Sequence, residues 1–92
     1  MSIARITHAS GFTGNPPPEA LQAVEALRAT DGCEHMYQFR NSQNGEGVTV
    51  TIWRDETALD AASEKYEAAR KLVTEHGLSI DSMKVYDVVA ER

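Results

Sequence analysis

The chain contains a single cysteine, Cys33, among its 92 residues. One cysteine excludes an intramolecular disulfide and, with no His or Asp at a recognisable spacing, gives no support to a catalytic thiol. The chain also lacks a run of about 18 apolar residues, the length that a membrane-spanning helix needs. The first ten residues hold no apolar stretch long enough for a signal peptide. We therefore expect a cytoplasmic protein that makes no use of a membrane.

Basic residues are few and scattered, since nine Lys and Arg stand against fourteen Asp and Glu, for a formal net charge of −5. Domains that bind nucleic acid concentrate Lys and Arg on one face or stripe. No such stripe occurs here, so we expect no nucleic acid partner. The sequence has no glycine-rich loop of the kind that binds phosphates, and its three histidines are not spaced as the ligands of one metal ion. We expect no metal, flavin or nicotinamide cofactor.

The hydrophobic pattern predicts six elements in one domain that covers residues 1–92. In chain order they are a strand over 2–10, a helix within 16–32, strands over 33–41 and 48–54, a helix from about 55 to 76, and a strand over 79–90. The order βαββαβ is that of the ferredoxin-like α+β fold. This fold has a four-stranded antiparallel sheet with both helices on one face.

Several residues predict where elements begin and end. Asn44-Gly45 is a hairpin turn signal between the second and third strands. Asp55 is a good N-cap for the second helix, and Gly77 is its expected C-terminal cap. His76 would then be a favourable cation at the C-terminal end of that helix.

The sheet has a second face that the helices cannot cover. If Asn41 pairs with Gly47, the hairpin sets Phe39 opposite Thr49, Tyr37 opposite Thr51, and His35 opposite Trp53. Those six residues would share the second face, while Val48, Val50 and Ile52 would face the helices. Such a face is too apolar for solvent, so we expect a second subunit, a ligand, or both to cover it. A slip of one residue would reverse the assignment.

Two segments, GCEHMYQFRN at 32–41 and GVTVTIWRDETALDAA at 47–62, resemble the antibiotic biosynthesis monooxygenase family of dimeric α+β barrels. The family pattern has a Gly before the second strand and a third strand that ends in Trp. An acidic or small polar pair and an Ala-rich helix follow. The resemblance implies a homodimer packed sheet to sheet, with a pocket between helices and sheet in each protomer that Trp53 partly walls.

The resemblance does not settle the chemistry. Thr49 stands where the cofactor-independent quinone-forming monooxygenases carry an Asn, and Ser63 stands where haem-degrading relatives carry an iron-binding His. A first-strand Asn of these proteins falls on Ala4, so only Trp53 matches. A cofactor-independent monooxygenase is implied first. A non-catalytic ligand-binding or stress-associated dimer, or an isomerase, cyclase or dehydratase on the same fold, stays open.

The candidate general bases are His8 and His35, because imidazole gains and loses a proton near neutral pH. Each could instead be a strand histidine satisfied by a backbone carbonyl. Asp87, if it faces inward on the last strand, would need a partner such as Arg5.

We expect a hydrophobic or aromatic small molecule as ligand. The candidate binding residues are Trp53, Tyr37, Phe39, Thr49, Thr51 and Tyr66. Trp53 has two interpretations, as one wall of the pocket or as a plug in the core. Tyr66 lies on the apolar stripe of the second helix, from which its hydroxyl could reach a pocket.

Overall fold

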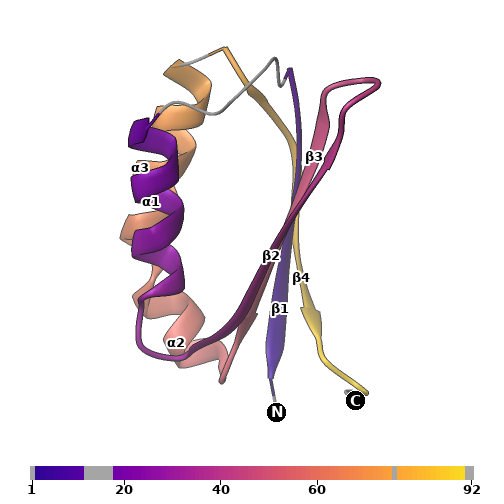
Figure 1. Cartoon of the computed structure of the whole chain (residues 1–92). Helices are drawn as coiled ribbons and strands as arrows, with labels where there is room; N and C mark the ends of the chain where they lie inside the picture. The colour runs from indigo at the N-terminus through magenta and orange to yellow at the C-terminus, as the bar shows by residue number, and fades with distance from the viewer. Residues whose placement is uncertain (1, 12–17, 76, 91–92) are drawn as a thin grey trace.

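The fold follows the predicted element order, with one helix divided. A computed structural model of the chain describes residues 2–11, 18–75 and 77–90. The elements are β1 (Ile3–Ser10), α1 (Pro18–Arg28), β2 (Cys33–Asn41), β3 (Glu46–Trp53), α2 (Glu56–Ala61), α3 (Ser63–Glu75) and β4 (Ser79–Asp87). The strands form one antiparallel sheet in the order β2-β3-β1-β4, and the helices lie on one side of it (Figure 1). The predicted ferredoxin-like α+β class is confirmed.

The second predicted helix is divided at Ala62. The Ala62 amide bonds back to the carbonyl of Leu59 at 3.1 Å, and its ψ of 0° leaves helical geometry. The Ala62 side chain is fully buried in the core. The break allows α2 to remain at the end of β3 while α3 runs beside α1 (Figure 1).

The residues predicted to begin or end helices and to form the hairpin turn do so where the structure describes them. Asp55 caps α2 by accepting a 2.8 Å hydrogen bond from the amide of Ala58. Gly77 follows α3 with a φ of +83°, and Gly45 turns the hairpin with a φ of +74°. His76 lies outside the described residues. Within residues 2–11, 18–75 and 77–90, no helix has both the length and the apolar character of a membrane span.

The predicted hairpin register is wrong by one residue. Asn41 pairs with Glu46 rather than Gly47, because the turn closes early: the Asn41 carbonyl accepts from the amide of Gly45 at 3.0 Å. The Asn41 side chain also accepts from the amide of Gln43 at 3.0 Å. Since side chains alternate between the two faces of a sheet, this slip separates residues that were expected to share a face.

In the observed register, β2 aromatics lie opposite the branched apolar residues of β3. Phe39 pairs with Val48, Tyr37 with Val50, and His35 with Ile52. These six residues point away from the helices, together with those at the matching positions of β1 and β4, which are Ala4, Ile6, His8, Ser82, Lys84 and Tyr86. We call this set the open sheet face. The expectation that Val48, Val50 and Ile52 face the helices is wrong.

The packed core lies at the end of the sheet where β3 meets α2. It consists of Leu27, Trp53, Ala58, Leu59 and Ala62. Trp53 is fully buried there, with 0% of its surface exposed. Away from this end, the helices and the sheet enclose a cavity.

Candidate functional site

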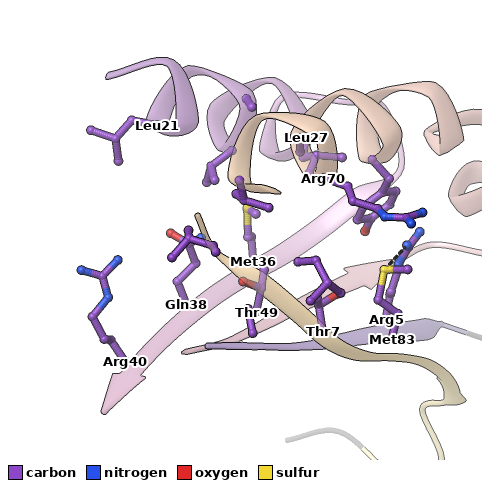
Figure 2. A pocket seen from close by; sticks show the side chains of 18 residues that line it. Arg5, Thr7, Leu21, Leu27, Met36, Gln38, Arg40, Thr49, Arg70 and Met83 are labelled. Atoms are coloured by element: carbon purple, nitrogen blue, oxygen red, sulfur yellow. Dashed lines mark hydrogen bonds between the residues drawn. The ribbon is translucent and has the colours of Figure 1, made fainter. Parts of the chain in front are cut away.

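A pocket of about 140 Å³ lies between α1, α3 and the helix-facing side of the sheet. Apolar stripes of the two helices form one wall, through Leu21, Val24 and Leu27 of α1 and Tyr66, Ala69 and Val73 of α3. The alternate residues of the strands form the floor, among them Arg5, Thr7, Met36, Gln38 and Thr49. Figure 2 shows these side chains rising from the sheet towards the helices.

The volume sets the scale of the ligand. An apolar cavity of about 150 Å³ accommodates a benzene ring, and this pocket of about 140 Å³ is close to that size. Leu21, Gln38, Arg40, Arg70 and Met83 line the pocket and are themselves exposed. They form a rim, through which a substituent on the ring can reach solvent.

Tyr66 connects the pocket to the core. Its hydroxyl accepts a 2.8 Å hydrogen bond from the indole Nε1 of Trp53 and forms a second one, of 2.5 Å, with the hydroxyl of Thr51. The Trp53 and Tyr66 rings lie 5.9 Å apart and are tilted by 59°. Trp53 and Thr51 are buried, so both need these partners.

The electrostatics keep Tyr66 protonated. Burial raises the pKa of its hydroxyl above the ordinary value, against the hydrogen bonds from Thr51 and Trp53 and the charge of Arg5, which lower it. At neutral pH Tyr66 is therefore a phenol and not a base. Burial likewise raises the pKa of the Cys33 thiol, opposed by the charge of Arg28. Cys33 is thus no activated nucleophile.

Arg5 lies on the floor of the pocket beside Tyr66. Its guanidinium carbon is 3.8 Å from the centre of the Tyr66 ring, within cation–π distance. Its Nη2 donates to the sulfur of Met83 at 2.9 Å, the contact dashed in Figure 2. Arg5 does not pair with Asp87: Arg5 lies opposite Val85, and Asp87 is exposed at the strand end and needs no buried partner.

The pocket is positively charged, although the chain is acidic. Arg5, Arg40 and Arg70 line it, and none of its lining residues in the described part of the chain is Asp, Glu, His, Lys or Cys. Nor do the described residues bring three or more His, Cys, Asp or Glu together as metal ligands. The arrangement can bind a small ring and stabilise negative charge on it.

Of the residues predicted to bind ligand, Thr49 and Tyr66 line the pocket. Thr51 and Trp53 lie behind Tyr66, so Trp53 is a core residue and not a pocket wall. His8, His35, Tyr37 and Phe39 belong to the open sheet face and do not line the pocket. Neither predicted histidine base is therefore placed to act on a ligand in this pocket.

The arginines and the other floor residues were missed by sequence reasoning. Met36 and Gln38 occupy β2 positions that the assumed register already placed on the helix side, but neither was chosen as a binding residue; Arg5 lies at the matching position of β1, opposite Thr51. The signal was present in the sequence: the alternation of Arg5 and Thr7 with Ala4, Ile6 and His8 marks two different faces, of which the more polar is turned inward.

Comparison with known proteins links the chain to one family. A family model described as antibiotic biosynthesis monooxygenase matches residues 1–72. The chain is 26% identical to Rv0793 from Mycobacterium tuberculosis, with a TM-score of 0.63, and the match covers 99% of this chain and 98% of that one. No curated protein matches the chain.

Two further solved structures share the fold at lower identity. A candidate antibiotic biosynthesis monooxygenase from Deinococcus radiodurans is 16% identical, with a TM-score of 0.70 and coverage of 100% of this chain and 96% of that one. SnoaB from Streptomyces nogalater, a cofactor-independent oxygenase solved as a point mutant, is 9% identical, with a TM-score of 0.72. That match covers 98% of this chain and 95% of SnoaB.

Proposed function

The chain belongs to the antibiotic biosynthesis monooxygenase family, and from this premise we propose that it is a cofactor-independent monooxygenase acting on a small aromatic substrate. The substrate binds in the pocket between the helices and the sheet. The working unit is a homodimer of the domain that spans residues 1–92. SnoaB, which has the same fold, is a cofactor-independent oxygenase.

The observation that carries the proposal is the combination of an apolar, ring-sized pocket with a floor arginine beside Tyr66. A cofactor-independent oxygenation needs an electron-rich substrate anion and a site that excludes bulk water. The apolar stripes of α1 and α3 exclude water, and the arginines favour the anion. Both requirements are therefore met by side chains that line one pocket.

The reaction that fits this site converts a phenol with a free para carbon to a quinone. The phenolate donates electrons to dioxygen at the para carbon, a new carbon–oxygen bond forms there, and the bond to the para hydrogen breaks. One oxygen atom stays as the second carbonyl and the other leaves as water, with both substrate hydrogens. The substrate is oxidised by two electron pairs in total, and dioxygen is the oxidant.

The described pocket residues supply no carboxylate or imidazole as a base. A cationic neighbour lowers the pKa of a phenol, so the arginines that line the pocket would favour loss of the substrate's hydroxyl proton to solvent. The rate should then rise with pH as the bound phenol ionises. In this mechanism the protein contributes charge, orientation and shape.

The homodimer is supported by the open sheet face. Tyr37, Phe39 and Tyr86 are 51%, 58% and 48% exposed on it. Lys84 is the only Lys, Arg, Asp or Glu among the residues that define it, with Glu46 on the same side at the hairpin end. An apolar, aromatic sheet surface of this kind is unfavourable in water. A second copy of the chain, packed sheet to sheet, would cover it.

The test is oxygen uptake with 1-naphthol and a panel of phenols, followed by an oxygen electrode and by quinone absorbance. One dioxygen consumed for each quinone formed, unchanged by a metal chelator, is expected. Met36→Trp, which fills the pocket from its floor, should abolish uptake while the fold persists. If the panel binds and no oxygen is consumed beyond the blank, the monooxygenase proposal fails.

A second candidate is a non-catalytic ligand-binding dimer. It is favoured by the lack of a base among the described pocket residues and by Thr49, whose hydroxyl lines the pocket where the oxygenases have an amide. Ser63, which stands where haem-degrading relatives carry a histidine, is exposed at the start of α3. Binding without oxygen uptake in the same experiment would identify this function.

A further inference from the structure

We propose that the natural ligand of the pocket is a hydroxyaryl carboxylic acid whose carboxylate binds the guanidinium of Arg5. This inference names the substrate class of the proposed monooxygenase and so rests on that function for its aromatic ring. The carboxylate itself is argued from the charges and contacts of the pocket.

The first argument is the uneven distribution of charge. Three of the nine Lys and Arg of the chain line one pocket, whereas none of the fourteen Asp and Glu does so among the described residues. In Figure 2 the side chains of Arg5, from the sheet, and Arg70, from α3, project towards the same end of the pocket. An anion at that end would be attracted chiefly by Arg5, with a smaller contribution from Arg70, whose charge is shared with Glu67 of the same helix.

The second argument is the lack of a counter-ion for Arg5. Arg28, Arg54 and Arg70 are all exposed, and each has a carboxylate oxygen within 3.7 Å. Arg5 is half-buried, yet its contacts are the Tyr66 ring and the Met83 sulfur, and no described carboxylate pairs with it. A partly desolvated guanidinium without a carboxylate is unfavourable, and an anionic ligand would compensate it.

The third argument is preorganisation. Trp53 and Thr51 fix the hydroxyl of Tyr66, and the Tyr66 ring in turn supports the guanidinium of Arg5. A guanidinium has five N–H donors in a rigid plane. Among the described residues, the Arg5 guanidinium has one acceptor, the thioether of Met83, which bonds Nη2. The remaining donors suit a planar, two-oxygen acceptor such as a carboxylate.

The rest of the pocket fits the ring and its hydroxyl. Val24, Leu27 and Met36 provide apolar contacts across a space of one-ring size. Gln38 lies at the opposite end from Arg5 in Figure 2, where its amide can bond a phenolic hydroxyl. An acid at one end, a ring in the middle and a hydroxyl at the other end match these three environments.

The experiment compares 3-hydroxyphenylacetate with its neutral amide, which has the same shape, by isothermal titration calorimetry at pH 7. The acid should bind about tenfold or more tightly than the amide, as a charge-assisted hydrogen bond implies. Arg5→Gln should remove this preference, and Arg5→Lys should keep part of it because the charge remains without the planar fork. Arg54→Gln, an exposed arginine outside the pocket, is the matched control and should leave the preference unchanged.

The outcomes separate the two proposals. If the amide binds as tightly as the acid, the ring site remains and the carboxylate inference is overturned. If neither binds at millimolar concentration, the pocket takes no small ring of this class, and the proposed function falls with the inference. If Arg5→Gln does not fold by circular dichroism, Arg5→Lys decides: the full wild-type preference in a folded Arg5→Lys would contradict a bidentate contact.

Discussion

The indole Nε1 of Trp53 donates a 2.8 Å hydrogen bond to the hydroxyl of Tyr66, which joins the buried end of β3 to the wall of the pocket. Trp53 itself has no exposed surface. The ring at the strand-to-helix junction therefore supports the site from behind. Its influence on a ligand passes through Tyr66 and then through Arg5.

Removing the Trp53 ring should destabilise the fold in two steps. Trp53→Phe keeps an aromatic plug and loses one buried hydrogen bond, so we expect a cost of about 1–2 kcal/mol in the free energy of unfolding. Trp53→Ala also leaves a cavity, with an expected cost of about 3–5 kcal/mol. Urea denaturation followed by circular dichroism measures both. Equal stabilities for the Ala variant and the wild type would contradict the buried position.

Ionisation of Tyr66 should lower the stability of the fold at alkaline pH. Burial raises its pKa in the folded chain above the unfolded value of about 10. The stability that protonated Tyr66 contributes to the fold is therefore complete below about pH 10, and it is lost as the pH rises through the folded pKa. Cys33, with a pKa raised from about 9, acts in the same direction.

Tyr66→Phe measures how much of the alkaline loss of stability is due to Tyr66. The variant should lose stability at neutral pH, by about 1–3 kcal/mol, because the Trp53 N–H is left without an acceptor. It should also show a flatter decline in stability between pH 9.5 and 11, roughly the range set by the ordinary tyrosine pKa. Thermal melts across pH test this, and an identical alkaline decline in both proteins would exclude Tyr66 as its source.

The element order and the inward stripes of the helices could be predicted, because an apolar repeat of 3.6 residues defines the buried side of a helix without further information. The sheet faces could not be predicted in the same way. Alternation along 48–54 shows that two faces exist, and the choice between them depends on where the turn closes. The turn signal Asn44-Gly45 was recognised, but the bond from Gly45 to the Asn41 carbonyl that sets the register was not.

This one-residue difference explains why the β3 residues were assigned to the opposite sheet faces. It turned Thr49, Thr51 and Trp53 of β3 towards the helices, whereas His35, Tyr37 and Phe39 of β2 lie on the face away from the helices, as predicted. The choice of Val48, Val50 and Ile52 as the helix-facing set assumed that the most apolar face packs inside the protomer. Here the more polar face lines a ligand-sized pocket, and the apolar face is turned outward.

Gly32 should be intolerant of any side chain. Its φ is +91°, and a Cβ built on it would lie 2.5 Å from the Cβ of Ala58 in α2. Gly77 has a similar φ of +83° and nothing within 4 Å of such a Cβ, so it provides a matched control. Gly77→Ala should cost about 1–2 kcal/mol for backbone strain alone, and Gly32→Ala should cost clearly more.

The additional loss of stability in Gly32→Ala, compared with Gly77→Ala, measures the contact between the new Cβ and α2. Adding Ala58→Gly to Gly32→Ala should recover part of the loss, after allowance for the cost of Ala58→Gly alone, because the clashing methyl group is gone. Chemical denaturation of the four variants gives this coupling. Equal costs for Gly32→Ala and Gly77→Ala would show that β2 and α2 move apart without resistance.

The last prediction tests which sheet face joins the protomers. Tyr37 stands between His35 and Phe39 on β2, with ring centres 6.3 Å from each neighbour, and all three belong to the open sheet face. Tyr37→Glu would place a carboxylate in the middle of the proposed interface, where burial without a partner is costly. Sedimentation should then shift from twice the 10.1 kDa chain mass to a single chain.

The adjacent Gln38 faces the pocket, so Gln38→Glu should alter ligand binding and leave the dimer intact. If Gln38→Glu splits the dimer and Tyr37→Glu does not, the protomers do not meet through the open sheet face. A wild-type chain that sediments as a monomer at micromolar concentration would remove the homodimer altogether.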